Sequence, residues 1–208
     1  VEGKTYLLPY SYVETQDRGR VNTSYGSKDN PIIIRTAKEF NEVMGNSKDS
    51  DIAKNYNSIE KPNQIFGSYR LVDDIDLNEL ITSSAETTFD LASINYSFTG
   101  KFYGNGFNIS NLSISARDKR FAFGMFASVE NQAIMLNFNL SVNQVINNQS
   151  ASVGAIAGIV RNAKIVNVEI TGNENSSIEG GNFVGGVAGM VIGKSQIKNI
   201  SMQNIKVL

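Results

Sequence analysis

The 208-residue sequence contains no cysteine, no histidine and no tryptophan, and only three prolines. Without cysteine, the chain can form neither a disulfide nor a thiolate metal site. Without histidine, it lacks both the commonest general base and the commonest metal ligand. We therefore expect no cofactor and no catalytic residues in this chain.

Charge and hydrophobicity argue against two further classes of protein. The formal net charge is −1, and the 19 basic and 20 acidic residues are spread along the chain without the basic stripe of a nucleic-acid-binding protein. No apolar run approaches the roughly 20 residues that span a bilayer. We expect neither nucleic-acid binding nor membrane insertion. The chain begins at Val1 without a signal peptide, so we expect it to be a piece of a longer precursor.

A short phrase recurs five times along the chain. Its copies read VDDIDL from Val72, ISNLSI from Ile109, MLNFNL from Met135, IVNVEI from Ile165 and IKNISM from Ile197. The third residue of each copy is asparagine or aspartate between apolar neighbours: Asp74, Asn111, Asn137, Asn167 and Asn199. Repeated strands separated by loops of variable length are typical of a solenoid.

The alternation within each repeat predicts how the strands pack. Apolar and polar residues alternate with a period of two, so each strand has one face to bury. Parallel stacking about 4.8 Å apart buries that face. The sequence therefore predicts an all-β fold, a right-handed parallel β-helix of four to five turns. We expect the repeated asparagines to point inward at a bend and to form a hydrogen-bonded ladder. Asp74 is expected to end this ladder in the terminal turn, where its carboxylate accepts backbone amides of the cap.

The two ends of the coil carry different signals. Residues 1–68 are predicted to form an N-terminal extension and cap, with a strand at 32–34 and a helix at about 37–44, and residues 69–208 to form the coil. A capping box of Thr36 and Glu39 begins the helix. Such a cap covers the first turn of a solenoid. The last strand, at 205–208, is followed by neither a capping helix nor a polar capping segment, so we expect further turns or another domain after Leu208.

Glycines recur at fixed places in the repeats. Residues 104–106 read Gly-Asn-Gly, a turn signal. Further on, residues 123–127, 154–158 and 185–189 align without gaps, and a valine follows each. A phosphate-cradling loop would need a following Lys-Ser/Thr and a helix, which these segments lack. We interpret as structural the glycines Gly104, Gly106, Gly154, Gly158, Gly185 and Gly189.

Several phrases resemble a known family. GAIAGIV and GGVAGMV resemble the GLUG repeat of adhesin-like bacterial surface proteins, and YRLVDDIDL with FTGKFYGNGFNISNLSIS resembles the segment that precedes such repeats. The order of these phrases within residues 31–208 also resembles the N-terminal region of zinc metallopeptidases of the immunoglobulin-A-protease type. The resemblance implies a β-helix on the outside of a bacterium and carries no activity. The His-Glu-x-x-His motif of those peptidases cannot be present, since the chain has no histidine.

Two places are candidate binding sites. Asp73 and Asp76, on either side of an inward Asp74, would point outward and offer oxygen ligands for calcium, although solvated surface carboxylates are the simpler interpretation. Among clustered aromatic residues, alternation places Phe98 and Phe102 in the core and leaves Tyr103 at the surface, as a binding candidate.

These observations lead to one functional hypothesis and two alternatives. The first is a non-catalytic module of a large secreted bacterial protein, extracellular or on the cell surface, that binds a host protein or a glycan and is joined to further domains. The second is the recognition region of an immunoglobulin-A-protease-type peptidase whose catalytic residues lie elsewhere. The third is a polysaccharide lyase or hydrolase, in which stacking would bring together acids such as Glu130, Glu169 and Glu179.

Overall fold

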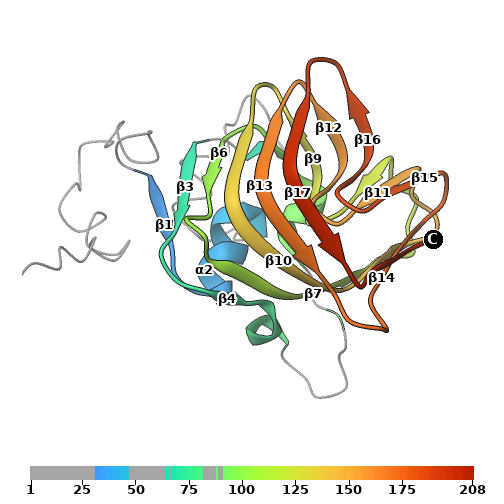
Figure 1. The fold of residues 1–208 in the computed structure, drawn as a ribbon, viewed down its shortest axis with the longest axis horizontal. Helices are drawn as coiled ribbons and strands as arrows, with labels where there is room; N and C mark the ends of the chain where they lie inside the picture. The colour runs from blue at the N-terminus through green and yellow to red at the C-terminus, as the bar shows by residue number, and fades with distance from the viewer. Residues whose placement is uncertain (1–30, 47–63, 66, 82–87, 89–90) are drawn as a thin grey trace, which may run out of the picture.

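The computed structural model describes residues 31–46, 64–65, 67–81, 88 and 91–208. These residues form a β-solenoid of about four turns with one short α-helix near the N-terminal end (Figure 1). The predicted parallel β-helix is confirmed. Residues 1–30 of the expected extension lie outside the described part of the chain.

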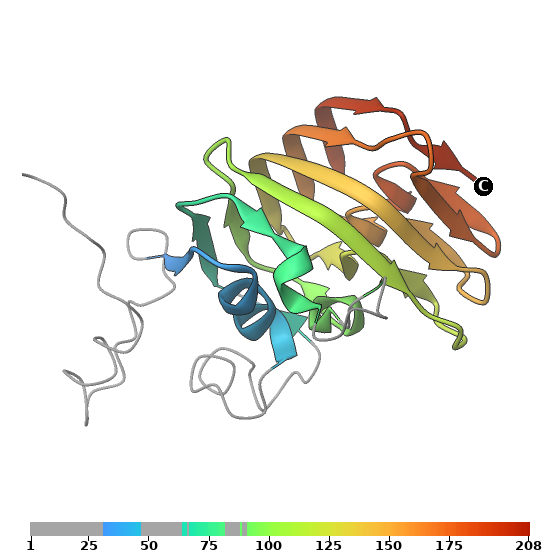
Figure 2. The ribbon, with the colours of Figure 1, turned by 90° about the horizontal axis from the view of Figure 1, so that it is seen from below.

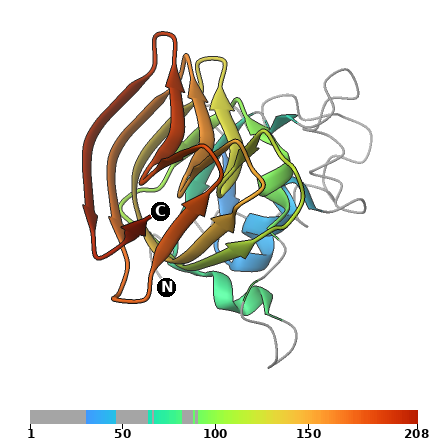
Figure 3. The same ribbon diagram turned by 90° about the vertical axis from the view of Figure 1, so that its right-hand side faces the viewer.

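Each turn of the coil adds strands beside those of the turn before, and the strands form three parallel sheets (Figures 2 and 3). The five-stranded sheet contains β2 (Gln64–Ile65), β5 (Ser97–Phe98), β9 (Phe126–Glu130), β12 (Ala157–Arg161) and β16 (Ala188–Ile192). The three-stranded sheet contains β8 (Ala122–Phe123), β11 (Ser152–Gly154) and β15 (Phe183–Gly185). The ten-stranded sheet contains β1 (Ile32–Ile34), β3 (Ser68–Leu71), β4 (Ile75–Asp76), β6 (Lys101–Tyr103), β7 (Asn108–Ser115), β10 (Ile134–Asn147), β13 (Lys164–Thr171), β14 (Ser177–Gly180), β17 (Gln196–Gln203) and β18 (Lys206–Val207).

Strand register places like residues above one another. Met135 pairs with Ile165 and Ile165 with Ile197, while Phe138 pairs with Val168 and Val168 with Ile200. Equivalent apolar residues of the repeats thus form two stacks that run along the coil. The ungapped alignment of 123–127 with 154–158 holds in the five-stranded sheet, where Phe126 pairs with Ala157. It is one residue out of register in the three-stranded sheet, where Phe123 pairs with Val153.

A strand and a short helix lie at the N-terminal end of the coil. β1 pairs with β3, and α2 (Ala37–Asn41) continues into a π-helical turn over Glu42–Asn46. The Thr36 side chain accepts a hydrogen bond from the Glu39 backbone N–H at 3.1 Å, as in a capping box. The Glu39 carboxylate accepts from the backbone N–H of Arg35, one residue earlier than a standard box requires. Phe40 on this helix is fully buried.

Two columns of aromatic rings run through the core. Phe40 contacts Phe102 at 6.3 Å between ring centroids, and Phe102 contacts Phe138 at 5.5 Å. In the second column, Phe98 lies 5.9 Å from Tyr69 and 5.2 Å from Phe126. The inward placement predicted for Phe98 and Phe102 is confirmed, since neither ring is exposed. The first column joins the helix to the coil.

The coil begins before the boundary expected at residue 69, because β2 already pairs with β5. Two 3₁₀ turns, over Leu77–Leu80 and Ala92–Asn95, interrupt the early turns. In the last turn, Val191, Met202 and Leu208 are among the exposed apolar side chains. The continuation expected after Leu208 stays a prediction. Within the described residues, no helix has the length and hydrophobicity needed to cross a membrane.

Candidate functional site

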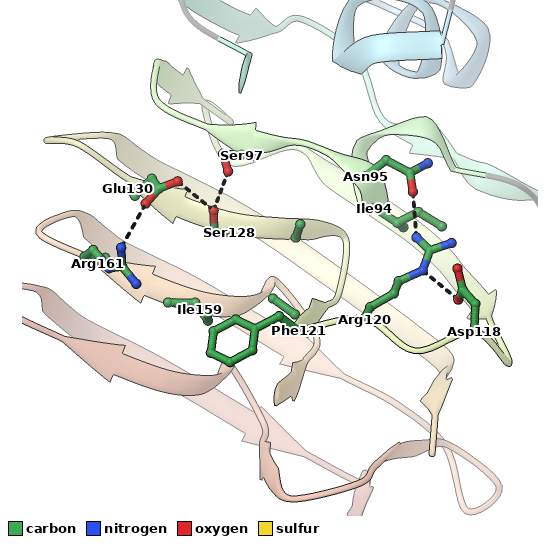
Figure 4. A pocket seen from close by; sticks show the side chains of 12 residues that line it. Ile94, Asn95, Ser97, Asp118, Arg120, Phe121, Ser128, Glu130, Ile159 and Arg161 are labelled. Carbon is green, nitrogen blue, oxygen red and sulfur yellow. Dashed lines mark hydrogen bonds and ion pairs between the residues drawn. The ribbon is translucent and has the colours of Figure 1, made fainter. Parts of the chain in front are cut away.

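A hollow of about 480 Å³ lies on the outer face of the five-stranded sheet (Figure 4). Its floor is an outward-facing column in which Ser97 pairs with Ser128 and Ser128 with Ile159. The alternate residues Phe98, Val129 and Val160 are in the core, which fixes the outward direction of this column. Three successive turns of the coil therefore build one surface.

One end of the hollow is formed by two neighbouring turns. Glu130 pairs in register with Arg161, and their side chains form an ion pair at 4.0 Å. The Ser128 hydroxyl lies 2.7 Å from Ser97 Oγ and 3.1 Å from Glu130 Oε1. The Arg161 side chain is 47% exposed and keeps guanidinium donors facing solvent.

The other end is organised by Arg120, which precedes β8. Its Nε donates to Asp118 Oδ1 at 2.7 Å and its Nη1 donates to Asn95 Oδ1 at 2.6 Å. The guanidinium lies over the Phe123 ring, 5.8 Å from its centroid. The hydrogen bond from Arg120 lowers the pKa of Asp118; burial opposes this effect, and the positive charge of Arg120 adds to it.

Phe121 lies between these two ends, beside Ile159 (Figure 4). Its side chain is 65% exposed. The preceding backbone is fixed, because Arg120 O accepts hydrogen bonds from Ala151 N at 3.0 Å and from Ser150 Oγ at 3.1 Å. An exposed aromatic ring is thus carried on anchored backbone.

A second hollow, of about 420 Å³, adjoins the first, because the two share lining residues. Lys119, Arg120 and Phe121 form one wall, and the loops at 148–151 and 181–182 form the other. Asn148, Gln149 and Asn182 contribute side-chain amides to this lining. Arg120 and Phe121 line both hollows.

The predicted ladder is divided among three hydrogen-bond systems. Asn167 Nδ2 donates to Asn137 Oδ1, and Asn199 Nδ2 donates to Asn167 Oδ1, both at 2.8 Å. Asp74 instead accepts from the backbone N–H of Asn108 at 2.8 Å and from its side chain at 3.0 Å. Asn111 donates to Asp76 at 2.8 Å. The predicted hydrogen bonds between stacked asparagines are thus present from Asn137 to Asn199, whereas Asp74 and Asn111 have other partners.

The predicted inward direction of the ladder is wrong. The side chains of Asn137, Asn167 and Asn199 are exposed, and their backbones have φ of 55°, 56° and 53°. Asparagine tolerates this left-handed conformation better than most residues. A single left-handed residue interrupts the alternation, so that Met135 and Phe138, three residues apart, both point into the core.

The acidic residues at 73–76 serve the local backbone. Asp73 Oδ1 accepts from the backbone N–H of Asp74 at 2.9 Å. Asp76 Oδ1 accepts from the backbone N–H of Asn78 at 2.9 Å and caps the first 3₁₀ turn. Among the residues that the structure describes, no group of three histidine, cysteine or acidic side chains is placed to hold a metal ion. The hydrogen bond from the Asn108 backbone, followed by that from its side chain, lowers the pKa of Asp74.

Tyr103 and the glycines lie away from the hollow. Tyr103 is half-buried in β6, between Arg70 and Leu136 of the adjacent strands. Of the glycines singled out in the sequence, Gly106 adopts a positive φ of 83°. At the others, an added Cβ would collide with atoms of nearby segments; these residues are Gly104, Gly154, Gly158, Gly185 and Gly189.

The sequence analysis missed Phe121 and both arginines of the hollow. A partial signal is present, since charged residues at 117–120 come directly before the aromatic pair Phe121 and Phe123. Equivalent positions in neighbouring repeats also carry opposite charges, Glu130 and Arg161. Folding of the 118–121 segment beside the sheet has no comparable signature in the sequence.

The hollow combines two carboxylates with two arginines, a set that polysaccharide-cleaving enzymes also use. Asp118 and Glu130 lie at opposite ends of it (Figure 4). A general acid in a glycosidase needs a raised pKa, whereas the pKa of Asp118 is lowered. Each carboxylate also contacts an arginine. The arrangement favours binding through hydrogen bonds over acid catalysis by Asp118.

Comparison with known proteins gives limited similarity. No family model matches the chain, so the GLUG resemblance is not confirmed. Halomucin from Haloquadratum walsbyi is 36% identical over 124 residues, which are 58% of this chain and 1% of halomucin. A crystal structure of a candidate immunoglobulin A1 protease from Bacteroides ovatus aligns with a TM-score of 0.45 and 17% identity, over 85% of this chain and 58% of that one. The chain thus spans a minor part of halomucin and somewhat more than half of the structural neighbour.

Proposed function

We propose that this chain is a non-catalytic recognition module of a larger extracellular or cell-surface protein. The observation that carries the proposal is the exposed Phe121 ring, which is held on anchored backbone and lines two adjoining hollows. A single exposed ring is common on protein surfaces, but aromatic side chains at the centre of a polar hollow are typical contact residues of binding sites. Paired charges and side-chain amides around the ring supply directional hydrogen bonds.

Two further observations support this role. The three sheets share one core, so the coil is a rigid support for side chains on its outer face. The pKa of Asp118 is lowered, which suits a carboxylate that stays ionised and accepts hydrogen bonds. The extracellular setting is supported by the similarity to halomucin.

A binding screen that also measures turnover tests the proposal. The purified chain is applied to arrays of glycans and of host proteins, and each bound ligand is then incubated with it and analysed by mass spectrometry. We expect saturable binding to a restricted set of ligands whose masses do not change. Conversion of a ligand to product would show an enzyme, and absence of binding by a folded sample would favour a structural spacer; either result would overturn the proposal.

A further inference from the structure

The first hollow is electrically balanced and rich in both donors and acceptors. Arg120 and Arg161 offset Asp118 and Glu130, so the four formal charges sum to zero. The Asp118 and Arg161 side chains are 57% and 47% exposed, so both can bind a ligand without first breaking their ion pairs. Such a surface suits an uncharged ligand whose groups both donate and accept hydrogen bonds, as hydroxyl groups do.

The apolar part of the hollow is small and flat. Phe121 and Ile159 lie side by side between the ion pairs (Figure 4). Ile159 is only 4% exposed, so the Phe121 ring provides most of the accessible apolar surface there. Pockets for drug-like molecules are lined mainly by apolar side chains, unlike this one. One aromatic face surrounded by polar groups matches a pyranose ring, which has apolar C–H faces and a hydroxyl rim.

The position of Phe121 also indicates a ligand longer than one ring. The two hollows that it lines have volumes of about 480 and 420 Å³, each in the range of a small-molecule site. Amide side chains line the second hollow, together with Ser150 and Lys119. A chain of linked sugars can lie across the ring and fill both hollows at once.

We propose that the first hollow binds a neutral pyranose ring of an oligosaccharide, stacked on Phe121 with its hydroxyls bonded to Arg161, Glu130 and Asn95, and that the sugar chain continues into the second hollow. This proposal rests on the proposed recognition function; it adds the class of ligand and the place where the ligand binds. Arg120 is a positioning residue, since it holds Asp118 and Asn95 and fixes the backbone that carries Phe121.

The absence of tryptophan makes a direct test available. The substitution Phe121→Trp introduces a single fluorescent reporter at the proposed platform and keeps an aromatic face there. Tyr103→Trp, on β6 of the ten-stranded sheet, is the matched control. Neutral oligosaccharides that bind the unmodified chain on a printed glycan array are titrated into both variants. We expect a saturable emission change in F121W and none in Y103W.

Alanine variants complete the test. Phe121→Ala should weaken binding about tenfold or more, as loss of a central aromatic contact does. Its melting temperature should be nearly unchanged because the ring is exposed. Tyr103→Ala should bind like the unmodified chain.

Three results would overturn the inference. Binding of host proteins with no oligosaccharide would remove the ligand class and leave the recognition function standing. An emission change in Y103W on adding the oligosaccharide, or unchanged oligosaccharide affinity in Phe121→Ala, would show that the ligand binds elsewhere. Binding restricted to acidic glycans would contradict the charge argument.

Discussion

At the scale of single residues, asparagine controls the bends of this coil. With one exception, the described non-glycine residues with positive φ are asparagines, among them Asn137, Asn167 and Asn199. Asparagine visits the left-handed region at lower cost than most side chains, and its amide can pair with an equivalent amide one turn away. The repeated asparagine therefore has two separable effects, one on the backbone and one between turns.

Two substitutions of Asn167 separate these effects. Asn167→Gly removes the amide hydrogen bonds and keeps access to positive φ, so we expect a loss of about 1 kcal/mol in the free energy of unfolding. Asn167→Ala also strains the backbone, and we expect about 2 kcal/mol. Urea unfolding of both variants measures the difference. Equal losses, or a larger loss for glycine, would contradict the importance of the left-handed bend.

Asp74 should give the coil a component of stability that depends on pH. Its pKa in the folded chain is below the ordinary value of 3.8 because Asn108 donates two hydrogen bonds to the carboxylate. A lowered folded-state pKa stabilises the fold fully above the unfolded-state pKa, and that contribution is lost as the pH falls through the folded-state pKa.

Asp74→Asn provides the comparison for this effect, because the amide oxygen still accepts a hydrogen bond but does not titrate. Above about pH 5, the difference in unfolding free energy between the unmodified chain and D74N should be constant. Below pH 3.8 it should shift in favour of D74N. Denaturant titrations over a pH series measure it, and parallel profiles down to about pH 2 would show that Asp74 has no such role.

At the scale of strands and turns, the sequence predicts the coil better than the candidate site. The stacks of Met135 with Ile165 and of Phe138 with Val168 follow from the repeat, because equivalent positions of successive copies pair in register. The outward direction of Asn137 was not predicted, because strict alternation from Met135 places Asn137 inward. The left-handed backbone of Asn137 turns its side chain outward and lets Phe138 point into the core. The hollow depends on where the 118–121 segment packs, which no local period encodes.

Gly158 tests the close approach of neighbouring strands. A Cβ at this position would collide with the backbone N of Phe123 and lie 2.6 Å from the Ala122 Cβ. Gly158→Ala should therefore cost about 1–3 kcal/mol of stability through overpacking. Adding Ala122→Gly should restore only part of the loss, because the backbone collision remains. Thermal unfolding of the single and double variants measures this, and an unchanged melting temperature for G158A would refute the packing role.

At the scale of the whole molecule, the aromatic column joins the N-terminal helix to the coil. Phe102 contacts Phe40 of the helix on one side and Phe138 of β10 on the other. One continuous core cluster includes all three residues. We infer that the helix and the first turns unfold together, because neither can bury its apolar face alone.

Phe102→Ala tests that coupling. Removing a fully buried ring should cost about 3–5 kcal/mol. In thermal unfolding followed by circular dichroism, Phe102→Ala should lose its helical and β-sheet signals in one transition, as the unmodified chain does, but at a lower temperature. Phe121→Ala is the control, since that ring is exposed and should leave the transition unchanged. A helix that melts separately from the coil, before or after the substitution, would contradict a shared core.

The central claim is that a rigid β-solenoid presents Phe121 and its flanking ion pairs as a binding surface without acting on the ligand. A crystal structure of the chain with its tightest-binding oligosaccharide tests this most directly. We predict an intact sugar chain stacked on Phe121, with hydroxyls within hydrogen-bond distance of Arg161. A sugar bound on another face, or cleaved in the hollow, would contradict the account.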